Sequence, residues 1–335
     1  MSNLRERLVA GIEREGPIDV DEYMHICLHD PADGYYATRP ALGADGDFIT
    51  APHVSQMFGE LLGAWSAEVW SRLGRPDRVR LVELGPGDGT MMADALRAAR
   101  AAPGFIEAIE LVLLETSAPL RAKQAERLSG RWIRRLEEIG DDAPVILLAN
   151  EFLDCLPIRQ AVSVSGLPRE RCVGLDGHGG LAFTPAAVDD ATIIEWSPEA
   201  ERLGADIGAL IVKAGGVALL IDYAGDGLGD TLQAVRAHRK EGPLDHPGEA
   251  DLTARVDFSR FLASVGAETH GPVAQGAFLR ALGLDARAAA LSRANPDHAG
   301  KIRRQVSRLA GRGQMGELFQ VACIATADLT PPGFS

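Results

Sequence analysis

A glycine-rich turn directly after an apolar segment is the first candidate for chemistry. The segment covers residues 79–84, and Gly85, Gly87 and Gly89 follow at alternate positions before a helical pattern begins. Glycines at such a place let the backbone approach a bound molecule closely, and free N–H groups at the start of a helix face that molecule. The pattern predicts a site for a nucleotide-like ligand, although a tight turn without a function has the same sequence.

Two acidic residues beside this turn indicate which ligand fits. Glu83 precedes the turn and Asp88 lies within it, where a dinucleotide would place its pyrophosphate. Like charges at short range repel each other, so a phosphate is disfavoured there. S-adenosylmethionine has no phosphate and carries an ammonium and a sulfonium group. The same two carboxylates therefore favour S-adenosylmethionine as the cofactor.

A further acid, Glu115, follows the next apolar segment, residues 111–114. An acid at the end of the neighbouring strand can accept hydrogen bonds from both ribose hydroxyls of an adenosine. The alternative is an exposed acid that caps a helix. With a covering loop included, the predicted cofactor contacts are Glu83, Gly85, Pro86, Gly87, Gly89, Thr90, Glu115, Thr116, Asp47 and Thr50.

Three polar residues, Asn150, Glu151 and Asp154, come after the apolar segment 145–149. Methyl transfer depends mainly on the alignment of acceptor, methyl carbon and sulfur. Carboxylates suit a cationic acceptor, because the guanidinium fork of arginine matches a carboxylate in bidentate geometry. We predict these three as the catalytic residues. Alternatively, Glu151 caps a helix and Asp154 pairs with a surface base.

Two polar loops have two interpretations each. Residues 46–52 include Asp47, Phe48 and Thr50, and they form either a lid over the cofactor or a packed N-terminal loop. Residues 247–253 form either a lining of the acceptor channel or an acidic surface turn.

The composition disfavours several other functions. The chain has 34 Lys and Arg against 47 Asp and Glu, so a nucleic-acid partner is disfavoured. The four cysteines form no Cys-x-x-Cys pair, and His25 and His29 have no adjacent third ligand, so we predict no metal. The chain start lacks the apolar core of a signal peptide, and no apolar run is long enough for a bilayer. We therefore expect a cytoplasmic protein without membrane insertion.

The candidate residues stand at the ends of short apolar segments that alternate with helical patterns. This alternation predicts an α/β fold with a Rossmann-like parallel sheet covered by helices on both faces. Ligands bind at the carboxyl ends of such strands. The predicted strands are residues 79–84, 111–114, 145–149 and 217–222, with a final strand at 315–325.

Other segments surround this sheet. We predict that residues 1–75 form a helical region with the covering loop and that residues 76–335 form the Rossmann-like domain. Insertions are expected at about 159–196, where apolar and polar residues alternate as in an antiparallel hairpin, and at about 225–312. The second insertion contains a predicted helix at 276–295.

Several motifs together resemble the MidA-like family of methyltransferases. They occur in the order of that family, between about residue 15 and residue 323. The segments are Gly34-Tyr35-Tyr36, residues 46–52, residues 55–60, residues 83–87, residues 150–157, Asp222-Tyr223 and residues 247–253. Two positions depart from the family pattern: Ala224 stands where glycine is usual, and Arg255 stands where histidine is common, which weakens any role for a histidine base there.

The resemblance implies a class I methyltransferase fold with an added N-terminal part, S-adenosylmethionine as the methyl donor, and a protein arginine as the acceptor. Mitochondrial members of that family are complex I assembly factors that methylate a protein arginine, so an assembly client is an expected partner. By position, Gly85, Gly87 and Glu115 would hold the cofactor, and Glu151 and Asp154 would face the acceptor. The alternatives are an assembly scaffold that binds the cofactor without turnover and a nicotinamide-dependent oxidoreductase, which the charges of Glu83 and Asp88 disfavour.

Overall fold

The computed structural model describes residues 3–38, 50–185 and 192–334, and it has two compact units built from three chain segments each. The first unit comprises Met1–Phe48, Leu153–Leu203 and Gly225–Phe261. The second unit comprises Ile49–Phe152, Gly204–Ala224 and Leu262–Ser335. Residues 49–75 thus belong with the second unit, whereas the sequence pattern grouped them with the N-terminal helices.

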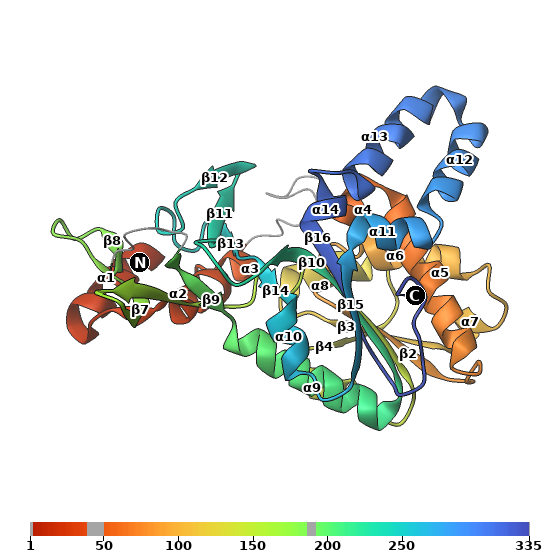
Figure 1. Ribbon diagram of the computed structural model, residues 1–335, viewed down its shortest axis with the longest axis horizontal. Helices are drawn as coiled ribbons and strands as arrows, with labels where there is room; N and C mark the ends of the chain where they lie inside the picture. The colour runs from red at the N-terminus through yellow and green to blue at the C-terminus, as the bar shows by residue number, and fades with distance from the viewer. Residues whose placement is uncertain (1–2, 39–49, 186–191, 335) are drawn as a thin grey trace. The chain divides into compact units, whose positions relative to one another are not determined.

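A mixed sheet forms the centre of the second unit (Figure 1). Its strands, in spatial order, are β15 (Glu268–Ala274), β16 (Phe319–Ala325), β10 (Gly216–Gly225), β5 (Val145–Asn150), β2 (Val79–Leu84), β3 (Ile109–Leu114) and β4 (Arg131–Ile133). The strands from β10 to β4 are parallel neighbours, and β16 is antiparallel to both β10 and β15. The predicted parallel sheet is confirmed, and its carboxyl ends share one edge.

Helices connect these strands and cover the sheet. They are α4 (Ala51–Val54), α5 (Gln56–Arg72), α6 (Thr90–Ala99), α7 (Phe105–Ala108), α8 (Ala118–Ala125), η1 (Leu136–Glu138), α11 (Gln275–Ala281), α12 (Leu284–Ala294), η3 (Pro296–His298), α13 (Ala299–Ala310) and α14 (Met315–Leu318). Two more helices, α9 (Pro198–Ala214) and α10 (Phe258–Ser264), cross from one unit to the other in sequence.

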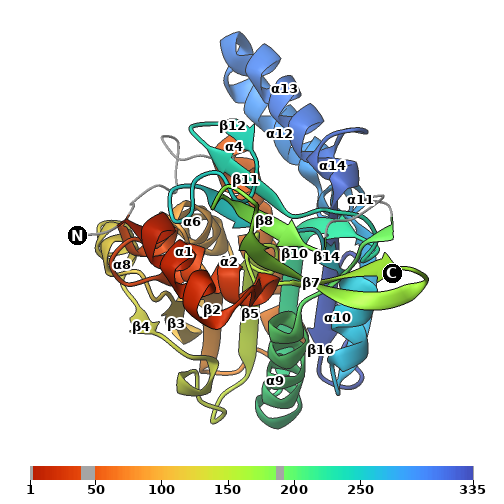
Figure 2. The same ribbon diagram turned by 90° about the vertical axis from the view of Figure 1, so that its left-hand side faces the viewer.

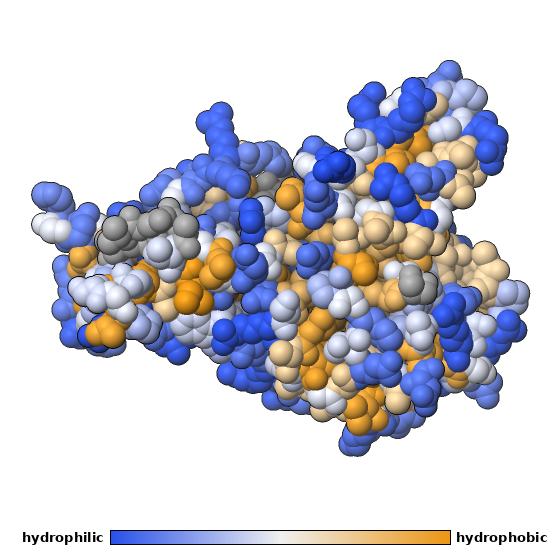
Figure 3. All heavy atoms as spheres, viewed as in Figure 1, coloured by the Kyte–Doolittle hydropathy of each residue, from blue (hydrophilic) through white to orange (hydrophobic). Residues whose placement is uncertain are grey.

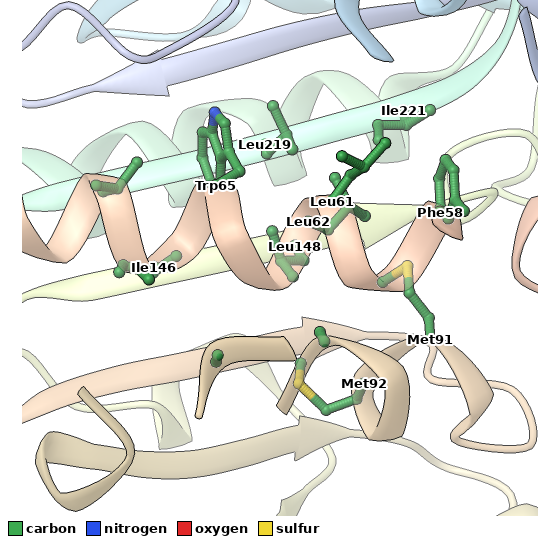
Figure 4. Close-up of a cluster of buried hydrophobic side chains, with 14 of the residues drawn as sticks. Phe58, Leu61, Leu62, Trp65, Met91, Met92, Ile146, Leu148, Leu219 and Ile221 are labelled. Carbon is green, nitrogen blue, oxygen red and sulfur yellow. The ribbon is translucent and has the colours of Figure 1, made fainter. Parts of the chain in front are cut away.

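The core of the second unit lies between the sheet and the α5–α6 pair (Figure 4). Trp65 of α5 lies near Leu219 of β10 and Phe58 lies near Ile221 of the same strand, and all four side chains are buried, as is Leu62. The spacing of three to four residues between Phe58, Leu62 and Trp65 gives α5 one apolar face. The N-cap Ser55 begins the helix by accepting a hydrogen bond from the Met57 backbone N–H at 3.3 Å. Alternate β10 residues such as Leu220 are buried on the opposite face, so both faces of the sheet are covered.

The two helices α5 and α6 approach closely because α5 has glycines at the crossing. A Cβ added at Gly63 would lie 2.1 Å from the carbonyl oxygen of Ala95, and one added at Gly59 would lie 2.7 Å from that of Met91. Only glycine fits such backbone contacts. This packing fixes α6, the helix that begins directly after the glycine turn.

The predicted helix at 276–295 is two helices. The chain turns at Gly283, whose φ is +96°, a left-handed conformation that favours glycine and ends a continuous helix. The second of these helices, α12, lies beside the following helix α13, and the two form a hairpin in both views (Figures 1 and 2). The predicted final strand is also shorter at its start, since residues 315–318 form α14.

Short strands and helices make up the first unit. The helices are α1 (Leu4–Glu15), α2 (Val20–His29) and α3 (Tyr35–Thr38). One sheet contains β1 (Ile18–Asp19), β7 (Leu167–Leu175), β6 (Arg159–Val164), β9 (Ile194–Trp196) and β8 (Leu181–Thr184), with β6 and β7 as the predicted antiparallel hairpin. A smaller sheet contains β12 (Arg239–Glu241), β11 (Gln233–Arg236) and β13 (Asp251–Thr253), and β14 (Val256–Asp257) follows it. Leu8, Tyr23 and Val173 are among the residues of this unit's own core. Within the described residues, no helix is both long and apolar enough to cross a membrane.

Candidate active site

Three strand ends of the second unit bring the candidate residues together. The β2 residue Leu84 is level with Leu114 of β3 and with Ala149 of β5. The segments that follow these three residues contain the glycine turn, Glu115 and Glu151 respectively. The sheet therefore places the glycine turn, Glu115 and Glu151 at one edge.

The turn after β2 has a backbone that only glycine adopts easily. Gly85, Gly87 and Gly89 have φ values of +60°, +57° and +80°, in the left-handed region. A Cβ on Gly85 would also lie 2.7 Å from the aromatic ring of Phe152. The turn is closed by a hydrogen bond from the Gly89 N–H to the Pro86 carbonyl at 2.9 Å. We call this turn, residues 85–89, the glycine cradle, and it leads directly into the N-terminus of α6.

Glu83 is a buried acid beside this cradle. Its residue is 3% exposed, and its Oε2 atom has no hydrogen-bond partner in the described part of the chain. Burial raises the pKa of Glu83 to about 8, and the nearby Asp88 carboxylate adds to the rise. A buried carboxylate oxygen without a donor is costly, so this atom is suited to pair with a cationic group of a ligand.

Asp88 is held in the ionised state within the turn. Burial alone would raise its pKa, but contact with His53 and hydrogen bonding to Thr90 bring the pKa of Asp88 well below its usual range. Asp88 Oδ1 accepts a bond from the Thr90 N–H at 3.0 Å, and His53 Nε2 lies 3.4 Å from Oδ2. Arg127 lies 3.6 Å from the same oxygen and donates to the Thr90 hydroxyl at 2.7 Å. Asp88 therefore organises the turn and has less free capacity for a ligand than Glu83.

Gln124 joins the glycine turn to the β3 acid. Its Nε2 donates to the Gly87 carbonyl at 2.9 Å and to Glu115 Oε2 at 3.1 Å. Its Oε1 accepts a bond from the Trp132 indole at 2.8 Å, so the whole amide is used. Glu115 is buried, and burial raises its pKa while donors from Ser117 and Gln124 oppose the rise. Glu115 is thus positioned by tertiary contacts and is not an exposed cap.

Glu151 has an unusual backbone conformation at the end of β5. Its φ is +51°, which a non-glycine residue rarely adopts. The side chain is held by the Ala51 N–H at 3.0 Å and by Asn150 Nδ2 at 3.1 Å. Burial raises the pKa of Glu151, and these two donors oppose the rise. The contact with Ala51 means that Glu151 caps the first turn of α4, and its role toward an acceptor stays a prediction.

Two neighbouring groups complete this corner. Asn150 Oδ1 is buried and has no hydrogen-bond partner among the described residues. Asp222, 1% exposed at the end of β10, accepts a bond from the Phe152 N–H at 3.1 Å. The carboxylate of Asp222 therefore fixes the chain just after Glu151.

The other predicted residues have different surroundings. Thr50 bonds through Oγ1 to His53 Nδ1 at 2.7 Å, which joins it to the Asp88 contact, and Thr116 is exposed. Asp47 lies outside the described residues. Asp154 belongs to the first unit, where its carbonyl accepts a bond from the Ala254 N–H at 2.8 Å, and its partnership with Glu151 stays a prediction.

The structure also gives the surroundings of Asp251 and of the His25/His29 pair. Asp251 of residues 247–253 is buried in β13, and its Oδ1 accepts a hydrogen bond from the Tyr36 hydroxyl at 2.8 Å. This acid is therefore not part of a surface turn. The rings of His25 and His29 lie 5.2 Å apart. Across the residues with described coordinates, no group of three or more His, Cys, Asp or Glu could hold a metal.

Sequence reasoning missed His53, Gln124 and Arg127. His53 follows the predicted covering loop, but nothing in the sequence links it to Asp88, 35 positions away. Gln124 lies ten residues after the end of β3 and carries no charge or spacing that marks a site. Only the packing of α8 beside the turn reveals its role.

The arrangement fits a small cationic cofactor that contains a ribose. The glycine cradle turns the backbone sharply at the strand end, Glu83 supplies a buried oxygen without a partner among the described residues, and Glu115 supplies an acid at the end of the next strand. S-adenosylmethionine has matching groups. The roles of Glu151 and Asn150 toward an acceptor stay predictions.

Comparisons with known proteins agree with this geometry. A family model for S-adenosyl-L-methionine-dependent methyltransferases matches residues 61–277. Among curated proteins, the chain is 34% identical to the mitochondrial protein arginine methyltransferase NDUFAF7 homolog of Drosophila melanogaster, over 95% of this chain and 84% of that protein. It is 33% identical to the mitochondrial protein arginine methyltransferase NDUFAF7 of Danio rerio, over 95% and 86%.

Solved structures show the same fold. A Burkholderia thailandensis protein bound to S-adenosyl-homocysteine matches with a TM-score of 0.86 and 26% identity, over 98% of this chain and 93% of that one. The predicted fold class, cofactor and family resemblance are confirmed. The predicted cytoplasmic location is contradicted, because the curated relatives carry mitochondrial names.

Proposed function

Because this chain belongs to the family of S-adenosylmethionine-dependent methyltransferases, we propose that it methylates an arginine side chain of a protein substrate and that Glu151 binds the guanidinium. The cofactor, when bound, supplies an electrophilic methyl group. The curated relatives are named as protein arginine methyltransferases, which supports the acceptor class. The observation that carries the residue assignment is the strained, doubly hydrogen-bonded Glu151 at the same sheet edge as the cofactor cradle.

The carboxylate of Glu151 suits this task for electrostatic reasons. Free arginine is protonated at neutral pH, with a pKa above about 12, so its nitrogen lone pairs are delocalised. A carboxylate that accepts two N–H bonds fixes the plane of the guanidinium and directs one nitrogen toward the methyl carbon. Asn150 Oδ1, buried without a partner, offers a further acceptor for a guanidinium N–H.

Asp154 is proposed as a second acid toward the acceptor, on the basis of the family motif that spans residues 150–157. The proposed cofactor contacts are those of the glycine turn together with Glu83, Thr90 and Glu115. Gln124 and His53 position these groups without a predicted contact to the cofactor.

The acceptor is tested by labelling. A lysate from cells that lack this protein is incubated with the purified protein and a tritiated methyl donor, and labelled proteins are hydrolysed and analysed by mass spectrometry. We expect methylarginine and formation of S-adenosylhomocysteine. Label on lysine alone, or cofactor binding without any product, would overturn the proposal, and the second result would favour the scaffold alternative.

The role of Glu151 is tested with Glu151→Gln. The amide keeps the size of the side chain and an oxygen acceptor for the Ala51 N–H, but it lacks the charge that attracts a guanidinium. We expect the rate of transfer to fall about 100-fold or more, while the affinity for S-adenosylhomocysteine stays within about twofold. Glu68→Gln is the control, because Glu68 is an exposed residue of α5 that pairs with Arg72. Transfer by Glu151→Gln at the rate of the unmodified protein would exclude the role.

A further inference from the structure

The hairpin of α12 and α13 forms a basic surface on an acidic protein. We call residues 284–312 the basic arm. The arm has seven Lys and Arg against two Asp, whereas the whole chain has 34 Lys and Arg against 47 Asp and Glu. Hydrophilic side chains border the arm in the space-filling view (Figure 3). Basic residues therefore outnumber acidic ones by five on the arm, whereas acidic residues outnumber basic ones by 13 in the whole chain.

The basic residues share the solvent side of α13. Lys301, Arg304 and Arg308 follow a spacing of three and four residues, which places them on one face of a helix. All three are exposed, and Ile302 and Leu309 are buried toward the rest of the second unit. The apolar face of α13 is thus used for packing, and its basic face remains accessible.

Most of these charges have no acidic partner within the chain. In the parts of the chain with described positions, Arg293, Lys301, Arg303 and Arg304 make no ion pair and no side-chain hydrogen bond. Arg287 differs, because it binds both carboxylate oxygens of Glu60, at 2.7 and 2.9 Å. One arginine anchors the arm to α5, and the others are available to a ligand.

The arm is joined to the active site through α4. Gln305 Nε2 of α13 donates to the Val54 carbonyl of α4 at 2.7 Å. The same short helix supplies the Ala51 N–H to Glu151 and the His53 side chain to Asp88. A molecule held on the arm would therefore bind next to the element that supports both the acceptor carboxylate and the cofactor turn.

We propose that the basic arm docks an acidic segment of the protein substrate, which rests on the proposed protein acceptor. Arginine predominates over lysine on the arm, and its planar fork binds carboxylates in bidentate geometry. A substrate with an acidic segment near its target arginine would bind more tightly through the arm. The basic residues of the arm would bind that segment without occupying the acceptor pocket. The arm then contributes to binding, while Glu151 contributes to transfer.

Two other polyanions fit this surface less well. Insertion into a membrane needs an exposed apolar helix face, and that of α13 is buried. A long nucleic acid would extend beyond the arm onto a chain that carries an excess of Asp and Glu, and it would be repelled there. A short acidic peptide segment is complementary to the arm alone.

The proposal is tested by binding of a fluorescein-labelled peptide of alternating glutamate and serine to the full-length protein, measured by fluorescence anisotropy at low ionic strength. The test variant is Lys301→Glu/Arg304→Glu. The control is Arg100→Glu/Arg134→Glu, which reverses two exposed and unpaired basic residues of the same unit. We expect the dissociation constant to rise about tenfold or more in the test variant and less than about twofold in the control.

Folding and function are checked separately. Affinity for S-adenosylhomocysteine should be equal in both variants, which shows an intact second unit. Equal loss of peptide binding in test and control, or tighter binding of phosphatidylserine vesicles or duplex DNA than of the peptide, overturns the proposal. Peptide binding is measured without turnover, so its result does not depend on the labelling experiment. If the protein methylated no substrate, the proposed function would be refuted, and the peptide-binding result would be unaffected.

Discussion

The turn after β2 and the turn after β5 lie at the ends of adjacent parallel strands, but they are stabilised in different ways. The first has three glycines with positive φ and closes through bonds between near neighbours, such as Gly89 to Pro86 and Thr90 to Asp88. The second places a glutamate, Glu151, in the left-handed region and holds its side chain through Ala51, a residue 100 positions earlier.

This difference separates two tasks. A turn made of glycines has no side chains to rearrange, so it presents its backbone and Glu83 to a cofactor in a fixed geometry. A strained residue persists only while its surroundings hold it, and such strain concentrates at functional sites. We therefore expect that any side chain added to the first turn disrupts it. At the second turn, glycine in place of Glu151 should preserve the fold but abolish methyl transfer.

The largest effect on cofactor binding is expected from Gly85→Ala. The new Cβ would overlap the Phe152 ring and force a left-handed alanine, which costs about 1–2 kcal/mol before the overlap is counted. We expect affinity for S-adenosylhomocysteine, measured by calorimetry, to fall about 50-fold or more. Gly74→Ala is the control, because Gly74 also has a positive φ but no atom within 4 Å of the added Cβ. Equal cofactor affinity in the two variants would show that the cradle is not the binding site.

The next effect concerns pH and Glu83. The folded-state pKa of Glu83 is raised from 4.5 to about 8, so the carboxyl is protonated below that pH. Glu83 must then lose a proton before it can pair with a cationic group. Affinity for S-adenosylmethionine should rise with pH up to about 8, by at most about tenfold per pH unit. In Glu83→Gln this dependence should be reduced to that of the remaining groups. An unchanged pH profile in the variant would exclude Glu83 as the ligand of the cationic group.

The same shift determines stability without the cofactor. In the unfolded chain Glu83 ionises near its ordinary pKa, so the folded state binds more protons between about pH 4.5 and pH 8. The contribution of Glu83 to the free energy of unfolding is therefore complete at low pH and is lost as the pH rises through about 8. Thermal unfolding of the cofactor-free protein should show a steeper fall across this range than that of Glu83→Gln.

A smaller effect is expected from Gln124→Leu, which tests whether the first turn depends on any distant contact. The substitution leaves Gly87 O and Glu115 Oε2 without their common donor. Loss of such bonds costs about 1 kcal/mol, so cofactor affinity should fall about fivefold. Arg127→Ala removes a more exposed donor to Thr90 and should change affinity less than about twofold. A larger loss in Arg127→Ala than in Gln124→Leu would contradict the assigned positioning role.

The smallest effect is expected on stability in Glu151→Gly. Glycine relieves the positive φ of this residue, and this gain of about 1 kcal/mol offsets the lost bond to Ala51. The free energy of unfolding from denaturant titration should therefore stay within about 1 kcal/mol of the unmodified protein, although transfer is lost. A loss of several kcal/mol would show that Glu151 serves mainly to hold α4.

The strands that end at the site and the chemistry of the first turn were predictable from the sequence. A continuous apolar segment such as residues 145–149 is buried on both faces of a parallel sheet, and glycines at alternate positions are recognised without knowledge of any distant partner. The edge strand Glu268–Ala274 was not predicted, because most of its side chains are exposed and it lacks an apolar pattern.

Only the tertiary structure decided the partners of the site residues. The contacts of Ala51 with Glu151, His53 with Asp88, and Gln124 with Glu115 join residues between 9 and 100 positions apart. Long-range contacts of this kind depend on how helices pack against the sheet, as the glycines of α5 show, and no local pattern encodes them. The same holds for the basic arm, whose charges are visible in the sequence while its free face and its link to α4 are not.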